Sequence, residues 1–187
     1  MSIAAMNSLD HSHFAAISWC APHLQGDRIV TGTPRSRVIK TTGEDALFGH
    51  TLNSESTIVR MLQVHEEPAS ATERVNEIKV FLTLGSGLNG YPDICHGGLV
   101  TTIMDEVIGI LIPVNRERKN ISSGTHMTAY LNTSFIRPVP TPATILARAW
   151  FTKIEGRKFY TQGSIEDESG RILARADALF VELKTSL

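Results

Sequence analysis

The segment at residues 91–113, YPDICHGGLVTTIMDEVIGILIP, constrains the fold more than any other part of the chain. It starts as a polar loop, continues through the sequence HGG at residues 96–98, and is then apolar almost without a break to Ile112. At about 100° per residue, its large apolar side chains fall on one broad arc and leave a narrow polar stripe that carries Asp105. A carboxylate in a segment suited to a protein core is costly unless it is paired or used. The segment therefore predicts a loop that leads into a buried helix of about four turns, which Pro113 ends.

Outside this segment, the chain from Thr57 onward contains stretches that alternate between apolar and polar residues with the period of β-strands. In the clearest case, residues 125–136, apolar side chains are expected on one face and polar ones, including Thr128, on the other. Glycine-containing turns at 155–156 and 169–170 join the last three strands as hairpins. One helix and hairpin-spaced strands predict the α+β class, with an antiparallel sheet wrapped around one long central helix. The predicted strands cover residues 58–65, 76–84, 125–136, 143–154, 157–166 and 171–183.

The N-terminal part of the chain differs in character from the rest. Residues 1–55 are predicted to form an extension that precedes a domain over residues 56–187. Residues 1–9 are predicted to be disordered, and Asp10 is predicted to cap a short helix over residues 11–19.

Composition excludes several classes of function. The 187 residues carry 18 basic and 19 acidic side chains, which gives no overall attraction to nucleic acid. No apolar run reaches the roughly 18 residues of a membrane span, so none is predicted. Cys20 and Cys95 lie far apart and no third ligand stands near His11 and His13, so no disulfide, metal site or bound cofactor is predicted. Unpaired cysteines favour a reducing, cytoplasmic location.

The combination of HGG at residues 96–98, a helical Asp105 and strands downstream resembles the hotdog-fold acyl-CoA thioesterases, in particular the phenylacetyl-CoA-thioesterase-like branch. The resemblance covers roughly residues 55–183 and implies the hotdog fold. It also implies an acyl-CoA or acyl-carrier thioester as substrate and a homodimer, with a tetramer built from two dimers as the alternative. One position departs from the pattern: several relatives place an Asn six residues before the His, whereas this chain has Gly90 there and Asn89 one residue away.

Thioester hydrolysis needs a hydrogen-bond donor for the developing oxyanion and a base or nucleophile beside it. Gly97 and Gly98 open the predicted helix, so their N–H groups have no acceptor within it, and the helix dipole adds positive potential there. The resemblance places the substrate carbonyl on the Gly97 N–H, with Gly98 in the substrate-binding loop. Asp105 is then the base or nucleophile, and His96 orients the substrate. The alternatives are a tight turn for the glycines and a structural role for His96.

Other polar residues are weaker candidates. Thr128 aligns with a position where relatives carry a Ser or Thr that contacts the substrate or the attacking water, although a threonine on a wet strand face is also ordinary. Arg157 and Lys158 are proposed to meet the phosphates of coenzyme A, ahead of the other loop cations Arg116, Arg118, Lys119 and Arg137. Glu106 lies about 100° around the helix from Asp105 and is interpreted as structural. A catalytic pair of Cys95 with the adjacent histidine is disfavoured, because neighbouring side chains rarely point together.

A single chain is not expected to hold a complete site. Gly97 and Asp105 are eight residues apart, which is about 12 Å along a helix, and a base must approach its proton-transfer partner to about 3 Å or act through one water. A second copy related by a two-fold axis, with its helix antiparallel, would bring the two groups together. The alternative functions are a non-hydrolytic acyl-CoA binder and a hotdog hydratase or dehydratase, although hydratase relatives usually pair Asp and His in a short motif that this chain lacks.

The segment at residues 28–55 is rich in Gly, Thr, Ser and charge and shows little periodicity, apart from a predicted short helix at 44–47. A structureless connection of this length is uncommon in a compact domain. We therefore expect it to pack over the substrate channel or over the edge of the dimer.

Overall fold

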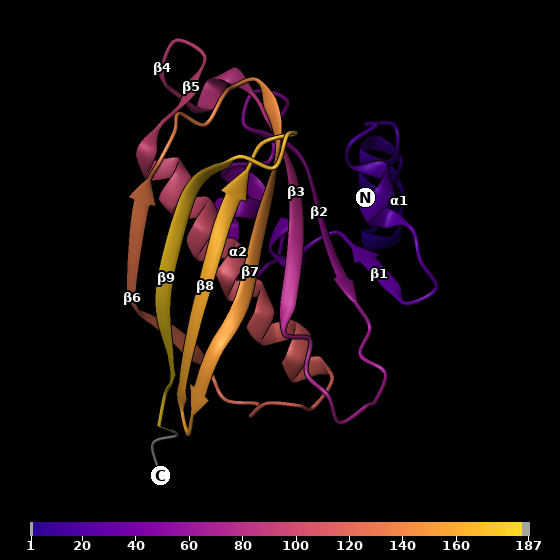
Figure 1. Cartoon of the computed structure of the whole chain (residues 1–187), viewed down its shortest axis with the longest axis vertical. Helices are drawn as coiled ribbons and strands as arrows, with labels where there is room; N and C mark the ends of the chain where they lie inside the picture. Colours follow the sequence, from indigo (N-terminus) through magenta and orange to yellow (C-terminus); the bar gives the residue numbers. More distant parts are fainter. Residues whose placement is uncertain (1, 185–187) are drawn as a thin grey trace.

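The computed structural model describes residues 2–184, so the outer limits of the predicted extension and domain, at residue 1 and residues 185–187, lie outside the described residues. A seven-stranded antiparallel sheet in the order β1-β2-β3-β7-β8-β9-β6 curves around the long helix α2, and α1 covers part of the opposite face (Figure 1). The predicted α+β hotdog fold is thereby confirmed. The elements are α1 Ile3–Ala15, β1 Ile29–Gly32, β2 Ile58–Glu66, β3 Glu77–Leu84, β4 Asn89–Tyr91, β5 Ile94–Cys95, α2 Gly97–Glu117, β6 His126–Phe135, β7 Ala143–Glu155, β8 Lys158–Glu166 and β9 Ile172–Glu182.

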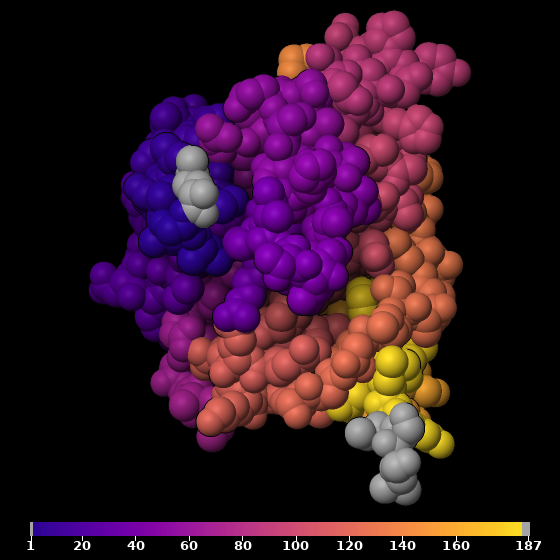
Figure 2. All heavy atoms as spheres, turned by 180° about the vertical axis from the view of Figure 1, so that it is seen from behind, coloured from indigo at the N-terminus to yellow at the C-terminus, as the bar shows by residue number. Residues whose placement is uncertain are grey.

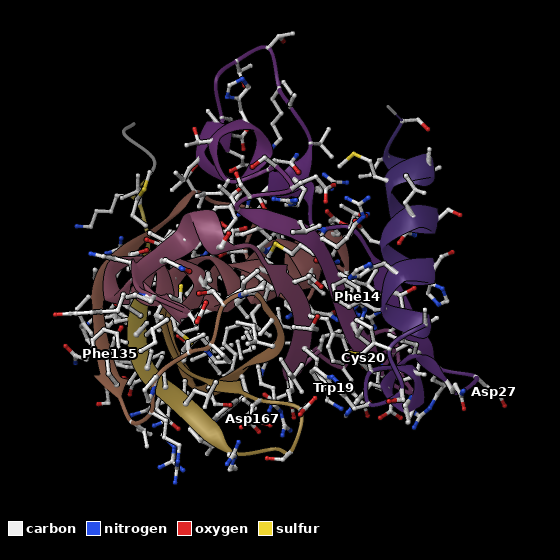
Figure 3. The ribbon with its side chains drawn as sticks, turned by 90° about the horizontal axis from the view of Figure 1, so that it is seen from above. Phe14, Trp19, Cys20, Asp27, Phe135 and Asp167 are labelled. Carbon is white, nitrogen blue, oxygen red and sulfur yellow. The ribbon has the colours of Figure 1, made fainter. Side chains whose placement is uncertain are left out.

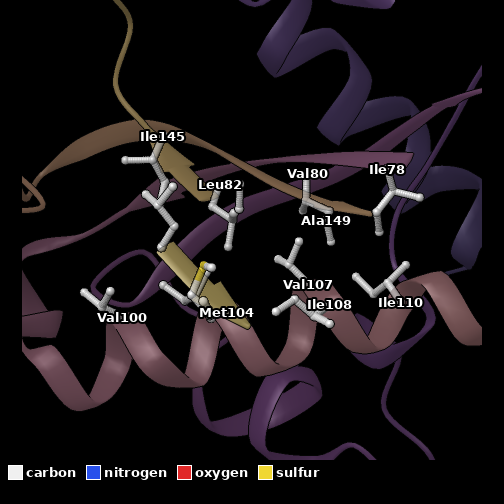
Figure 4. Packing of buried hydrophobic residues seen from close by; sticks show 14 of the residues in the cluster. Ile78, Val80, Leu82, Val100, Met104, Val107, Ile108, Ile110, Ile145 and Ala149 are labelled. Carbon is white, nitrogen blue, oxygen red and sulfur yellow. The ribbon is translucent and has the colours of Figure 1, made fainter. Parts of the chain in front are cut away.

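The main core lies between α2 and the concave face of the sheet. Side chains such as Met104 and Val107 point from the helix toward Val80 and Ile145 on the central strands (Figure 4). Met104 and Val107 are fully buried, and each such side chain contributes roughly 1.5–3 kcal/mol by leaving water. This apolar arc is the one that the sequence pattern predicts, and it fixes which stripe of α2 faces away from the sheet.

Helix α2 does not end at Pro113 as predicted but runs on to Glu117. Asn115 explains the extra turn: its side chain is fully buried, donates to the carbonyls of Val75 (2.9 Å) and Leu111 (2.8 Å), and accepts from the Val75 N–H (2.9 Å). These bonds stabilise the helix beyond the proline. By length and composition alone α2 could cross a bilayer, but half of its most apolar window is buried in the fold, so the absence of a membrane span stays a prediction.

The predicted disorder of residues 1–9 is wrong for the described residues, because α1 already begins at Ile3. The helix is capped by Ser2, whose hydroxyl accepts from the Ala5 N–H, and not by Asp10, which lies buried inside it and accepts a hydrogen bond from the Thr33 hydroxyl. Phe14 packs with Cys20 and Trp19 against the convex face of β2 and β3, where Figure 3 shows the three side chains together. Tertiary packing of Phe14 thus orders a segment whose composition resembles a tail.

The segment at residues 28–55 also carries more structure than predicted. Its first part forms β1, which pairs with β2 at the edge of the sheet, so the sheet begins inside the predicted extension. The helical turn lies at Leu47–Thr51 and not at 44–47. Arg37 holds this loop in place, since its buried guanidinium donates to the carbonyls of Phe48, Leu52 and Ile58.

Strand β6 forms the other edge of the sheet and departs from simple alternation. A bulge between Thr128 and Tyr130 shifts its register against β9, so the side chains on either side of it change faces. The predicted apolar face is therefore not buried as a unit: Met127 and Phe135 are 53% and 60% exposed. An edge strand with exposed apolar side chains is a surface on which a second strand can pair.

Candidate functional site

The site begins where the chain enters α2. His96 is the N-cap of the helix, and its Nδ1 accepts a hydrogen bond from the Gly98 N–H at 3.0 Å. The His96 carbonyl accepts from the N–H groups of Leu99 and Val100. Among residues 2–184 the Gly97 N–H has no hydrogen-bond partner, and Gly97 is partly exposed. The structural role that sequence analysis left open for His96 is therefore present, and it leaves Gly97 as the free donor of the first turn.

The loop before the helix explains why Gly90 stands where relatives carry an asparagine. A Cβ on Gly90 would lie 2.9 Å from the Cα of His96, so a larger residue would displace the cap. The side chain of Asn89 is hydrogen-bonded to the Thr141 hydroxyl. Asn89 thus anchors the loop. Among the described residues it forms no hydrogen bond with the Gly97 N–H.

Asp105 lies on the stripe of α2 that faces away from the sheet and is half-buried. The Thr128 hydroxyl, from the start of β6, donates to its Oδ1 at 3.1 Å. This contact fixes one carboxylate oxygen and leaves the other available to a water or a substrate. The sequence placed both residues among the candidates, and the structure brings them together.

Gly97 and Asp105 remain apart in one chain. Helix α2 is continuous between them, so their separation is about 12 Å along the helix axis. Phe135, at the end of β6, lies beside Gly97, because a Cβ there would be 3.5 Å from its ring. Figure 3 shows Phe135 at the rim of the molecule, so the free N–H opens toward the exposed edge of the sheet.

A pocket of about 640 Å³ adjoins Asp105. The polar stripe of α2 forms its floor, and residues 33–45 of the extension form one wall. Whether the extension covers the substrate channel stays a prediction. Glu106 also lines the pocket. Burial raises the pKa of its carboxyl, and the nearby Ser36 hydroxyl opposes part of this shift. The sequence predicts that this segment packs over the domain but not which of its residues line the pocket, because residues 33–45 have no periodic pattern.

Comparisons with known proteins show which family the chain is similar to. The family description of the thioesterase superfamily matches residues 93–174, a range that includes the helix cap, Asp105 and Thr128. The match covers less than half of the chain, and over this range the chain is similar to the thioesterase superfamily. This similarity supports thioester hydrolysis as the general class of reaction.

The individual relatives of the chain are distant. Verlamelin biosynthesis protein B from Lecanicillium sp is 29% identical over 164 residues, which cover 72% of this chain and 71% of that protein. The mouse acyl-coenzyme A thioesterase THEM4 is 34% identical over 100 residues, 53% of this chain and 40% of the enzyme. The crystal structure of a thioesterase superfamily protein superposes with a TM-score of 0.50 at 26% identity, covering 64% of this chain and 55% of that one. The chain thus spans less than half of the mouse enzyme.

The predicted phosphate-binding residues lie away from the helix cap. Arg157 and Lys158 form the turn between β7 and β8, at the opposite end of the sheet from the start of α2 (Figure 1). The Arg157 guanidinium donates to the Glu182 carbonyl at 2.8 Å. Their role in binding coenzyme A stays a prediction, and a single chain does not bring them to Gly97.

The cysteines of the chain show no sign of activation. Burial raises the pKa of the Cys95 thiol to about 11 and that of Cys20 to about 12. A thiol with such a pKa is not a nucleophile near neutral pH, which argues against a catalytic Cys95–His96 pair. Within residues 2–184 no cluster of three His, Cys, Asp or Glu side chains has the arrangement of a metal site.

Proposed function

We propose that the protein is a cytoplasmic enzyme that hydrolyses acyl-coenzyme A or acyl-carrier thioesters. The observation that carries the proposal is the Asp105–Thr128 hydrogen bond on the polar stripe of a helix whose first N–H, that of Gly97, is free. A carboxylate held in one orientation and a free donor at the positive end of a helix are the two groups that acyl transfer to water requires.

The two groups act across a homodimer in this proposal. Strand β6 is an edge strand with exposed Met127, Tyr130 and Phe135, which supports its pairing with β6 of a second copy. Antiparallel pairing about a two-fold axis would place Asp105 of one subunit near the partner subunit's Gly97. Each dimer then holds two composite sites.

In the proposed reaction Asp105 accepts a proton from a water molecule while the water oxygen forms a bond to the thioester carbonyl carbon. The carbonyl oxygen takes up the negative charge and accepts a hydrogen bond from the Gly97 N–H. The C–S bond then breaks, the thiolate takes a proton, and a carboxylic acid and a free thiol leave. In the nucleophilic variant the Asp105 carboxylate itself forms the bond to carbon, the C–S bond breaks and the thiolate leaves and takes a proton from solvent. Water then hydrolyses the resulting anhydride, which releases the acid and restores the Asp105 carboxylate.

The test is a hydrolysis assay of the wild type and Asp105→Asn against a panel of acyl-coenzyme A thioesters. We expect the variant to fold and to lose roughly 10²-fold or more in kcat, the scale for a lost general base. Turnover that is equal in the two proteins refutes the role of Asp105. Binding without turnover by the wild type favours the non-hydrolytic binder, and hydration of an enoyl thioester favours the hydratase.

A further inference from the structure

The pocket beside Asp105 has an unusual charge composition for a space that would receive an acyl chain. Its floor includes Ile110, Pro113 and Phe180, and Figure 2 shows it as a hollow between the purple extension and the orange strand β6. Five carboxylates and three cations line it. The excess of carboxylates gives the pocket a negative potential, which low-dielectric walls concentrate.

The cations of the pocket are already engaged. Lys40 is bonded to Asp45 and lies 3.4 Å from Glu44. Arg35 pairs with Glu117 at 3.1 Å. These two basic side chains therefore have little remaining charge to offer an incoming anion.

The third cation, Arg116, donates to the Gly124 carbonyl at 2.9 Å and contacts Nδ1 of His126 at 3.1 Å. Burial and Arg116 lower the pKa of His126, so this histidine adds no positive charge at neutral pH. Among the described lining residues at the far end of the pocket, Arg116 is thus the cation, and it donates to Gly124 and contacts His126.

Glu106 faces this space next to Asp105. Two cations act on it: Lys40, which is shared with Asp45 and Glu44, and Arg37, which is buried and donates to three backbone carbonyls. Asp45 and Asp105 act on Glu106 as like charges. A further carboxylate brought into the pocket would meet Glu106 and Asp105, and Lys40, which is already shared by Asp45 and Glu44, would compensate only in part.

We propose that this pocket receives the acyl group and that Glu106, with Asp45 behind it, excludes acyl groups that carry a second carboxylate. The inference rests on the proposed thioesterase function and adds a substrate class: uncharged acyl thioesters in preference to ω-carboxyacyl thioesters. A carboxylate about 6 Å from Glu106 is disfavoured by about two orders of magnitude at an effective dielectric constant near 20. Partial compensation by Lys40 lowers the expected preference to about 30-fold.

The test compares three coenzyme A thioesters with six-carbon acyl chains: hexanoyl, adipoyl, and the monomethyl ester of adipoyl, which is uncharged but carries the same oxygens. We expect kcat/KM for hexanoyl and for the methyl ester to exceed that for adipoyl by about 30-fold. Glu106→Gln should lower the ratio of kcat/KM for the methyl ester to kcat/KM for adipoyl by about tenfold. The ratio within one protein is the readout, so a general loss of activity cancels.

Glu117→Gln is the matched control, since Glu117 lines the same pocket but is paired with Arg35 and should leave the ratio within about twofold. Binding of the non-hydrolysable thioethers S-hexyl-coenzyme A and S-(5-carboxypentyl)-coenzyme A to the wild type, by calorimetry, tests the preference without chemistry. If the wild type hydrolyses none of the thioesters but still binds S-hexyl-coenzyme A more tightly than the carboxylated thioether, only the proposed function is refuted. Equal use or equal binding of the charged and uncharged ligands, or binding of neither thioether, overturns this inference.

Discussion

Mixing two inactive variants tests whether the site is shared between subunits. Asp105→Ala removes the carboxylate, and Gly97→Pro removes the free N–H. Proline is well tolerated at the first position of a helix, and His96 already has the extended backbone (φ −61°, ψ 134°) that a residue before proline prefers. Each homodimer should lose about 10²- to 10³-fold in kcat, the range for a lost base or oxyanion donor.

The expected recovery follows from the 12 Å separation. If Asp105 and the partner subunit's Gly97 form one site, a heterodimer of the two variants has one site with both defects and one with neither. Each heterodimer should then regain about half of wild-type activity, and an equimolar mixture at random exchange about a quarter. The assay is thioester hydrolysis after subunit exchange, with heterodimers isolated by two different affinity tags.

Gly97→Ala is the control for this experiment, because it keeps the N–H and its Cβ would lie 3.5 Å from the Phe135 ring, an ordinary contact. It should lose far less activity than the proline variant. If isolated heterodimers stay as inactive as the parents while both parents fold and dimerise, the shared-site reasoning is refuted.

Three further predictions concern single residues. Thr128→Val should lower kcat about tenfold at unchanged thermal stability, because it removes the hydroxyl that orients Asp105, and Thr128→Ser should restore most of the loss; equal rates in the two variants contradict this role. Asn115→Ala should lower the free energy of unfolding in urea by about 3 kcal/mol, since it leaves the buried N–H and carbonyl of Val75 unpaired, whereas an unchanged midpoint contradicts the helix anchor. Burial in the folded state raises the pKa of Glu106, so the folded protein loses stability relative to the unfolded chain as pH rises through the pKa of the unfolded state. Glu106→Gln should therefore be more stable than the wild type at pH 8, and this difference should disappear near pH 4. Urea unfolding of both proteins at the two pH values measures it.

The sequence predicts the central helix and the strands because apolar residues recur at a regular spacing in both. The buried arc of α2 and the bounds of β2 and β3 follow from that pattern to within a few residues. The end of α2 does not, because it depends on Asn115 reaching Val75, a contact 40 residues away in the chain. Alternation likewise cannot reveal the bulge in β6, which is set by its pairing with β9.

Some residues of the candidate site can likewise be predicted from the sequence and others cannot. His96, Gly97 and Asp105 become candidates through the family that their motif resembles, and the Thr128 contact agrees with its predicted face. The pocket wall at residues 33–45 is not recognisable, because irregular loops carry no period that reports their position. The sequence also does not predict that α1 is ordered, because its packing depends on one aromatic side chain, Phe14.

The two fixed ends of α2 have a kinetic consequence. Hydrogen bonds of His96 stabilise the first turn of α2 and those of Asn115 stabilise its last turns, so we expect the helix that forms the floor of the pocket to move little. We expect any movement that admits substrate or releases product to lie in the wall at residues 38–45, beyond the points where this wall is attached to the sheet through β1 and to the core through Arg37. A cross-link between that wall and α2 should slow turnover while leaving the chemical step untouched, so release of the acid would become rate-limiting.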